Sequence, residues 1–219
     1  EIDYAKMNGM THEKLFSLFY KSKQLQRKNN GWEFDFFEQD YLGSKLDYDL
    51  VDSKSGKVLA KYGDKFNSLL AKNIKKEGIK KVFIDENSIV GKYLAKDVYD
   101  SNSEIIHFEA GDEITTTMLS FFSEKQINVF DILNINSDKQ GTYLRDTFFA
   151  DKNKNRNDAI TEIYKILRPG EPPTLEAADK LFRSLFFDRE RYDLSPVGRL
   201  KINTRLGLEA DLEKRTLEN

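Results

Sequence analysis

The stretch LDYDLVDSKSGKVLAKYGDKFNSLLAKNIKKEGIKKVFI, from Leu46 to Ile84, is followed 48 positions later by LAKDVYDSNSEIIHFEAGDEITTTMLSFFSEKQINVFDI, from Leu94 to Ile132. The two stretches align without a gap, and apolar character is kept at many pairs whose residues differ, such as Phe66 with Ile114. Identical pairs include Leu46/Leu94, Asp49/Asp97, Asp52/Asp100, Ser53/Ser101, Gly63/Gly111, Asp64/Asp112, Ile79/Ile127 and Ile84/Ile132. The pattern predicts an internal duplication, with copies at 46–84 and 94–132.

Each copy predicts two short strands, a helix and a closing strand. The strand pair turns at 52–56 in the first copy and at Asp100-Ser101-Asn102-Ser103 in the second, and the second strand ends in Gly-Asp. The helices are expected to bury Leu69, Leu70 and Ile74 in one copy and Met118, Leu119 and Phe122 in the other. Two such units can pack their apolar faces together, so we expect an α+β module with its own core over residues 31–136.

The Gly-Asp pairs at Gly63-Asp64 and Gly111-Asp112 precede helices, as phosphate-binding loops do. A single glycine lacks the run of backbone amides that cradles a phosphate, and no Lys-Ser or Lys-Thr pair follows either one. We therefore predict turns at these positions and no phosphate site.

Helical patterns lie on both sides of this module. Thr11 is expected to cap a helix from His12 to about Gln24, and the polar, turn-forming stretch Gln26–Gly31 gives the first boundary. The fold class is therefore α+β, with a mainly helical host, residues 1–30 and 137–219, interrupted by an insertion of two similar strand-strand-helix-strand units.

A rigid loop is predicted in the second part of the host. The stretch Leu167-Arg168-Pro169-Gly170-Glu171-Pro172-Pro173 ends a helical stripe that includes Ile160 and Tyr164. Proline lacks an amide donor and disfavours helical geometry in the residue before it, so this stretch cannot continue a helix. Thr174 caps the next helix, and Ser195-Pro196 begins a third. The loop would present one cation, Arg168, and one anion, Glu171.

Composition limits the function classes. A formal net charge of −2 and an isoelectric point near 5.9 argue against a surface that binds nucleic acid everywhere, so any such contact must be local. The absence of cysteine excludes disulfides and thiolate chemistry. No apolar run approaches the roughly 20 residues that span a bilayer. We expect a cytoplasmic protein without a membrane partner.

The sequence predicts no catalytic centre and no metal site. The two histidines, His12 and His107, fall in different predicted domains, and no His-Glu-x-x-His run, Gly-x-Ser-x-Gly elbow or Walker loop is present. Asp47, Asp49 and Asp52 alternate with apolar residues, which is typical of the solvated face of a strand.

Basic residues gather in the last part of the chain. Arg183, Arg189, Arg191, Arg199, Lys201 and Arg205 outnumber Asp188, Glu190 and Asp193, whereas the stretch from Trp32 to Ile135 is rich in acids. Local positive charge suits contacts with nucleic-acid phosphates. The alternative is that these arginines pair with neighbouring acids or tie helices to another domain, and both interpretations stay open.

Residues 159–203 carry a resemblance to a known family. They contain Glu162-Ile163-Tyr164-Lys165, Leu167-Arg168-Pro169-Gly170-Glu171-Pro172-Pro173-Thr174, Leu185-Phe186-Phe187 and Arg191-Tyr192-Asp193-Leu194-Ser195-Pro196-Val197-Gly198-Arg199. This segment resembles the lobe region of the β subunit of bacterial DNA-directed RNA polymerase. The part of the chain before Ile135 is similar to the rest of that lobe and to a lineage-specific insertion within it.

The resemblance implies a fragment of a multi-subunit nucleotidyltransferase at the nucleoid. The lobe would form part of the DNA cleft, and Arg168, Pro169, Gly170, Glu171, Pro172 and Pro173 would be its gate loop, with Arg168 near the non-template strand. Arg199, Lys201 and Arg205 would be possible contacts to DNA or to a neighbouring domain. No cofactor is expected in this fragment, because the family holds its catalytic Mg²⁺ on the β′ subunit.

Two functions remain in competition. Under the first, the partners are DNA, bound weakly in isolation, and the β′, α and σ subunits, with possible regulators or phage factors at the insertion. Under the second, the chain is a stand-alone protein-interaction module that binds transcription regulators without contacting DNA. Composition separates the two only by region, since the basic host favours nucleic acid and the acidic insertion disfavours it.

Overall fold

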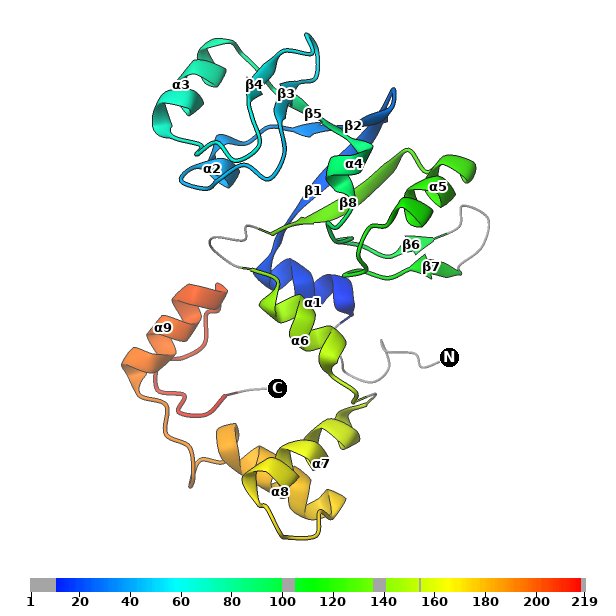
Figure 1. Ribbon diagram of the computed structural model, residues 1–219. Coiled ribbons are helices and arrows are strands. Elements are labelled where there is room, and N and C mark those ends of the chain that lie inside the picture. The colour runs from blue at the N-terminus through cyan, green and yellow to red at the C-terminus, as the bar shows by residue number, and fades with distance from the viewer. Residues whose placement is uncertain (1–10, 100–104, 136–140, 154, 218–219) are drawn as a thin grey trace. The chain divides into compact units, whose positions relative to one another are not determined.

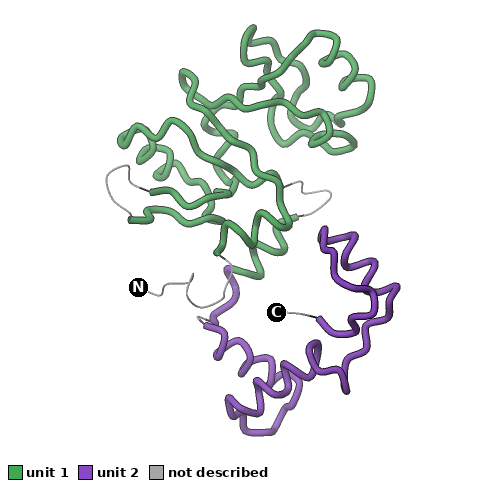
Figure 2. The backbone as a smooth tube through the Cα atoms, turned by 180° about the vertical axis from the view of Figure 1, so that it is seen from behind, with its two compact units in different colours: residues 1–148 green, residues 149–219 purple. Residues whose placement is uncertain are grey.

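The computed structural model describes residues 11–99, 105–135, 141–153 and 155–217. The chain divides into two compact units, residues 1–148 and residues 149–219 (Figure 2). Helices and an antiparallel sheet are both present, which confirms the predicted α+β class. Within the described ranges, no helix is both long enough and apolar enough to cross a membrane.

Unit 1 carries the strands and the shorter helices (Figure 1). In chain order its elements are α1 (His12–Phe19), β1 (Lys21–Lys28), β2 (Gly31–Asp35), α2 (Glu38–Tyr41), β3 (Leu50–Asp52), β4 (Val58–Ala60), α3 (Ser68–Lys76), β5 (Lys81–Asp85), α4 (Glu86–Ile89), β6 (Val98–Tyr99), β7 (Ile106–Phe108), α5 (Thr116–Glu124) and β8 (Val129–Asn134). The helix α6 (Tyr143–Ala150) spans the division, and unit 2 continues with α7 (Arg156–Leu167), α8 (Leu175–Phe186) and α9 (Pro196–Leu206).

The main sheet has the strand order β4-β3-β5-β2-β1-β8, and neighbouring strands are antiparallel. Strand β1 lies between β2 and β8, with Leu25 opposite Phe130 (Figure 1). The expectation of a helix to Gln24 was wrong, because α1 ends at Phe19 and the backbone then becomes extended. A boundary at residue 31 falls inside the β1–β2 hairpin, so the compact units do not follow the three predicted segments.

Strand β1 was missed because its sequence carries almost no periodic signal. Lys21–Lys28 contains one apolar residue, Leu25, whose side chain is fully buried. The strand forms because β2 on one side and β8 on the other satisfy its backbone donors and acceptors, and because Leu25 is buried in the core beneath the sheet. Pairing across the sheet therefore decides the local structure here.

The two similar segments make the same hydrogen bonds at positions 48 residues apart. Each contains two strands, a helix and a closing strand, β3-β4-α3-β5 and β6-β7-α5-β8, which is the predicted order. Equivalent bonds are Gly63 N–H to Leu46 O and Gly111 N–H to Leu94 O (both 2.8 Å), Lys61 N–H to Asp64 Oδ2 and Glu109 N–H to Asp112 Oδ2 (both 2.9 Å), and Tyr62 N–H to Asp49 Oδ1 and Ala110 N–H to Asp97 Oδ1 (both 2.7 Å).

These bonds show what the Gly-Asp pairs do. Gly63 and Gly111 have φ values of +83° and +92°, a region that favours glycine, and the aspartate that follows closes a turn through its side chain. The predicted turn at 52–56 is confirmed, with Asp52 accepting the Ser55 amide at 2.9 Å. The corresponding turn predicted at 100–103 lies outside the described residues.

One continuous core joins the two segments to the β1–β2 hairpin. Its fully buried side chains include Leu25, Trp32, Phe66, Leu94 and Phe122, and the Trp32 and Phe130 rings meet edge to face with centroids 4.6 Å apart. Each such side chain stabilises the unit by about 1.5–3 kcal/mol relative to an exposed one.

Fewer of the predicted apolar side chains of α3 are buried than its sequence pattern indicates. Ile74 and Ala71 are buried, but Leu69 is 68% exposed, so its assignment to the buried side was wrong. The helix is capped by Asn67, whose side chain accepts the amides of Leu69 and Leu70, and Leu69 lies in its exposed first turn.

Unit 2 is built on the pair α7 and α8. Ile160, Tyr164 and Ala178 form its small buried core, with Leu181 and Phe182 packed against it. The predicted caps are confirmed, because Thr174 Oγ1 accepts the amide of Ala177 and Ser195 Oγ accepts that of Gly198.

Candidate nucleic-acid interface

The proline loop begins where α7 ends. The amide of Arg168 still donates to Tyr164 O at 2.8 Å, but Arg168 itself has left helical geometry. Gly170 has a φ of +90°, which residues with a side chain rarely adopt, and the Glu171 amide returns to Arg168 O at 3.3 Å. Residues 168–173 are all exposed. The loop is a tight turn with its side chains in solvent.

A side-chain bond braces this turn against the helix. The hydroxyl of Tyr164, in the last turns of α7, donates to Glu171 Oε2 at 2.7 Å. The other carboxylate oxygen of Glu171 lies 3.7 Å from Arg168 Nη1, and both charged side chains are about half exposed, at 54% and 53%. The hydrogen bond to Glu171 raises the pKa of the Tyr164 hydroxyl. Arg168 is therefore presented beside a carboxylate that is itself held in place.

A second polar contact ties the two helices together. Asp179 of α8 accepts from Arg156 Nη2 of α7 at 2.7 Å and from Arg183 Nε of its own helix at 2.6 Å. The bond from Arg156, followed by the one from Arg183, lowers the pKa of Asp179. The helices on both sides of the loop are thus fixed to each other, so the loop has a firm base.

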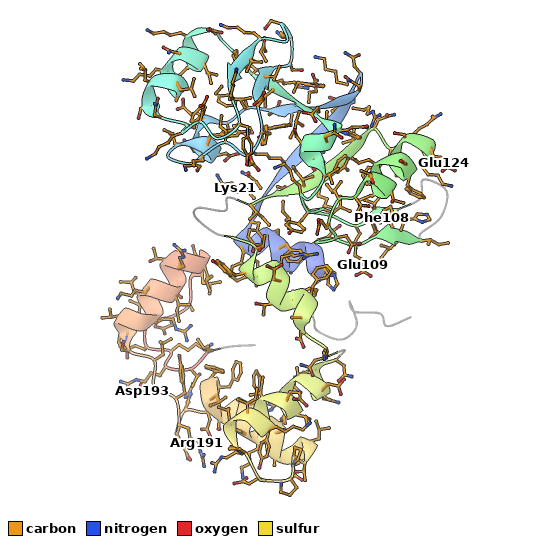
Figure 3. All side chains as sticks on the ribbon, in the orientation of Figure 1. Lys21, Phe108, Glu109, Glu124, Arg191 and Asp193 are labelled. Atoms are coloured by element: carbon orange, nitrogen blue, oxygen red, sulfur yellow. The ribbon has the colours of Figure 1, made fainter. Side chains whose placement is uncertain are left out.

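The other predicted basic residues differ in accessibility. Lys201 and Arg205 are exposed on α9, and Arg189 and Arg191 are exposed before it (Figure 3 labels Arg191). Arg199 is only 3% exposed, and its guanidinium donates to Lys214 O at 3.0 Å and to Thr216 O. Arg199 therefore binds the C-terminal segment of its own unit, and Arg183 pairs with Asp179, as the alternative interpretation of the arginines expected.

Carboxylates and histidines do not gather into a metal site within the described residues, where no group of three or more such side chains has suitable spacing. His12 and His107 lie in the same compact unit, His12 3.5 Å from a Glu109 oxygen and His107 against the Phe121 ring. The arrangement around the loop can do something simpler, since an exposed guanidinium on a fixed turn is suited to a charge-assisted contact with a phosphate.

Comparison with known proteins decides the family. Residues 131–219 match the family described as RNA polymerase Rpb2, domain 2. Over 95% of its length, this chain is 40% identical to the DNA-directed RNA polymerase subunit beta of Rickettsia conorii and 41% identical to that of Rickettsia felis. The chain belongs to the β-subunit family of bacterial DNA-directed RNA polymerase. The β subunit of Caulobacter vibrioides is 38% identical, again over 95% of this chain.

The chain spans only 15% of the length of the curated relatives that it matches. The resemblance noted on residues 159–203 lies inside the matched range, and the match extends through the duplicated region as well.

Sequence reasoning missed the residues that support the proline loop. Tyr164 was assigned to an apolar stripe, and the structure shows that its ring is buried with Ile160 while its hydroxyl reaches Glu171. A tyrosine in the last turn of a helix before a proline loop is a usable signal, because its polar end needs a partner when its ring is buried. Asp179 gave no such signal, since its partner Arg156 is 23 positions away.

Proposed function

We propose that this chain is the part of a β subunit that lines the DNA cleft of RNA polymerase, with residues 168–173 as its gate loop. The observation that carries the proposal is the identity of about 40% over 95% of the chain, together with an exposed, braced turn that holds one cation. The whole enzyme would be a nucleotidyltransferase acting in transcription, in the cytoplasm at the nucleoid, with β′, α and σ as partner subunits and its Mg²⁺ on β′.

The proposal divides the chain into two parts of a lobe, residues 1–30 and 137–219, and an inserted module, residues 31–136. The matched hydrogen bonds of the two segments support an origin of the module by duplication of 46–84 as 94–132. Because β1 pairs with β2 and β8, the module would share its sheet with the first part of the lobe.

The role proposed for the loop follows from its charges. Arg168 would contact a phosphate of the non-template strand, with Pro169, Gly170, Pro172 and Pro173 limiting the conformations of the turn. Glu171 would orient the Arg168 guanidinium and keep it from folding back onto α7. The exposed Lys201 and Arg205 are further candidates for DNA or a neighbouring domain, whereas Arg199 is already used inside its unit. A few such contacts imply weak, salt-sensitive binding of DNA by the isolated chain.

The decisive test replaces Arg168 with alanine in the complete polymerase of the source organism. We expect promoter open complexes to dissociate about tenfold faster, because one charged contact to a phosphate is worth on the order of 1.5 kcal/mol, while elongation is nearly unchanged. Lys165→Ala is the matched control, because Lys165 is an exposed cation on the last turn of α7, outside the loop, and pairs with Glu162. An unchanged open-complex lifetime would remove Arg168 from the site.

A second function belongs to unit 1. Its surface exposes large apolar side chains, including Phe37 (60%), Tyr62 (74%) and Leu69 (68%), in a region rich in acids. Such a surface suits regulators or phage factors, and a stand-alone interaction module would use it without contacting DNA. Capture of proteins by residues 1–148, compared with a Leu69→Asp/Tyr62→Ser variant, separates this function from the cleft role, which does not depend on these residues.

A further inference from the structure

The two similar segments carry opposite charge. From Lys54 to Lys81 the first segment holds nine lysines and two acids, whereas the equivalent residues 102–129 hold one lysine and five acids. The stretch from Trp32 to Ile135 is rich in acids as a whole, so its positive charge is concentrated in the first segment. Electrostatics therefore distinguish two segments that share one plan of strands and helix.

Three of these lysines lie on the solvent side of α3. Lys72, Lys75 and Lys76 are exposed, while Ala71 and Ile74 are buried. Spacings of three and four residues place Lys75 and Lys76 beside Lys72, and the three side chains form the lysine face of α3. Within the described residues, no carboxylate pairs with any of them. Like charges at this spacing repel by about 0.2–0.5 kcal/mol per pair, so a bound anion would relieve the repulsion.

The equivalent helix of the second segment, α5, shows that the fold does not require these lysines. Both helices have nine residues, and α5 carries Ser120, Ser123 and Glu124 at the equivalent positions. Lysines near a helix C-terminus offset the helix dipole, which is a structural reason for Lys75 and Lys76. The last turn of α5 contains no basic residue, yet the helix has the same length. The charge of the lysine face is therefore available for a function other than folding.

Further lysines surround the C-terminal end of α3. Lys57 Nζ lies 2.8 Å from Glu77 Oε1, and Glu77 caps that end of the helix, so the β3–β4 turn lies beside it. Lys54 is exposed in this turn, and Lys80 is exposed between α3 and β5. Of the lysines from Lys54 to Lys81, only Lys57 and Lys81 pair with a carboxylate among the described residues. The lysine face is thus part of a wider basic surface.

The chemistry of this surface favours nucleic acid over protein as its partner. Protein–protein interfaces are depleted in lysine, whereas exposed lysines contact phosphates as point charges. Duplex DNA carries one negative charge for about every 1.7 Å of its axis, so several lysines can engage it together. We propose that the lysine face of α3 binds the phosphate backbone of duplex DNA without reading its sequence. The inference rests on the proposed function only in naming DNA as the polyanion, since α3 lies in unit 1 and the proline loop in unit 2.

Binding of the 219-residue chain to a fluorescent duplex of about 30 base pairs, followed by anisotropy, tests the proposal. The variant Lys72→Ser/Lys75→Ser/Lys76→Glu gives α3 the residues that α5 already carries. We expect its Kd to be at least about tenfold higher in about 50 mM NaCl. The slope of log K against log salt should be smaller in magnitude by about 2–3, because each lost phosphate contact removes about 0.9.

The control variant Lys14→Glu/Lys152→Ser/Lys180→Ser removes the same charge from exposed lysines elsewhere, and its Kd should stay within about twofold of the wild-type value. Unchanged Kd and slope in the α3 variant overturn the proposal. An equal loss in the control also overturns it, because net charge alone would then govern binding. If poly-L-glutamate competes with the duplex equally well, charge for charge, the choice of DNA is wrong and an acidic protein is the occupant.

A third variant separates this proposal from the proposed function. Arg168→Ala/Lys201→Ala/Arg205→Ala removes the candidate contacts of unit 2 and leaves α3 intact. Loss of affinity in the α3 variant supports the lysine face, whether or not the unit 2 variant also loses affinity. Loss in the unit 2 variant alone overturns the lysine face and leaves the proposed function standing.

Discussion

The hydroxyl of Tyr164 donates to a carboxylate oxygen of Glu171 at 2.7 Å, across the turn that the proline loop makes between α7 and α8. The same carboxylate faces the guanidinium of Arg168 at 3.7 Å. A buried ring thus fixes an exposed anion, and the anion orients an exposed cation. The loop receives its rigidity from this contact as well as from its prolines.

Replacing Tyr164 with phenylalanine tests this bracing. The ring stays packed with Ile160 while Glu171 loses its hydrogen bond from the Tyr164 hydroxyl, so we expect lower amide order parameters by NMR at Gly170 and Glu171 and little change elsewhere in unit 2. Tyr143→Phe, at a 79% exposed tyrosine, is the control. Unaltered order parameters in the loop would mean that the prolines alone hold it.

The same bond predicts a dependence on pH. The pKa of Tyr164 is raised in the folded state, chiefly by its bond to Glu171, so the neutral hydroxyl is the favoured form. Its contribution to stability is complete below the ordinary tyrosine pKa of about 10 and is lost as pH rises through the higher folded value. Denaturation of the chain above pH 10 should show this loss in the wild type and not in Tyr164→Phe.

Glu33 predicts a pH dependence at the acidic end. Hydrogen bonds from Lys81, Ser53 and Lys28 hold its pKa at about 2, below the ordinary value of 4.5. Because the folded pKa is depressed, the contribution is complete above about pH 4.5 and is lost as pH falls through 2. Since both lysines are partly exposed, we expect about 2 kcal/mol.

The variant Glu33→Gln should therefore unfold at lower urea concentration than the wild type at pH 7, and the gap should narrow from pH 4.5 to pH 2. Glu124→Gln, at an exposed glutamate of α5 (Figure 3), should match the wild type throughout. A constant gap between Glu33→Gln and the wild type at every pH would show that packing, and not charge, is what the substitution removes.

The α+β class, the helix caps at Thr11, Thr174 and Ser195 and the proline loop could be predicted because each depends on residues close in sequence. Strand β1 could not, because one apolar residue in eight gives no period and only β2 and β8 make the strand. The burial of Arg199 was equally hidden, since its acceptors are carbonyls 15 and 17 positions later. Both features depend on partners far away in the sequence, which a local sequence pattern does not reveal.

The helix α3 offers a matched pair of leucine-sized side chains. Ile74 is 2% exposed and Leu69 is 68% exposed, although the sequence pattern places both on the buried side. Ile74→Ala should lower the free energy of unfolding by about 2–4 kcal/mol, and Leu69→Ala by less than about 0.5 kcal/mol. Equal losses in urea denaturation would mean that Leu69 is covered in solution.

The position of β1 predicts which fragment folds. Residues 1–148 keep the whole sheet, whereas residues 31–136 lack β1 and leave β2 and β8 without the strand between them. Losing the buried Leu25 alone costs about 2–3 kcal/mol, so the shorter fragment should melt at least about 10 °C lower or without a cooperative transition. Equal melting temperatures by circular dichroism would show that the module is independent of β1.

The duplication makes its sharpest prediction at Gln126, which has a φ of +55° just after α5 and stands 48 positions after Gly78, with φ +68° just after α3. Glycine adopts this left-handed conformation without the penalty of about 1 kcal/mol that a side chain incurs. Gln126→Gly should therefore raise the free energy of unfolding by about 0.5–1 kcal/mol, and Gly78→Gln should lower it by about 1 kcal/mol. Nothing lies within 4 Å of a Cβ at Gly78, so its loss would measure the backbone alone. Urea denaturation decides, and a destabilised Gln126→Gly would mean that the glutamine side chain contributes more than its backbone costs.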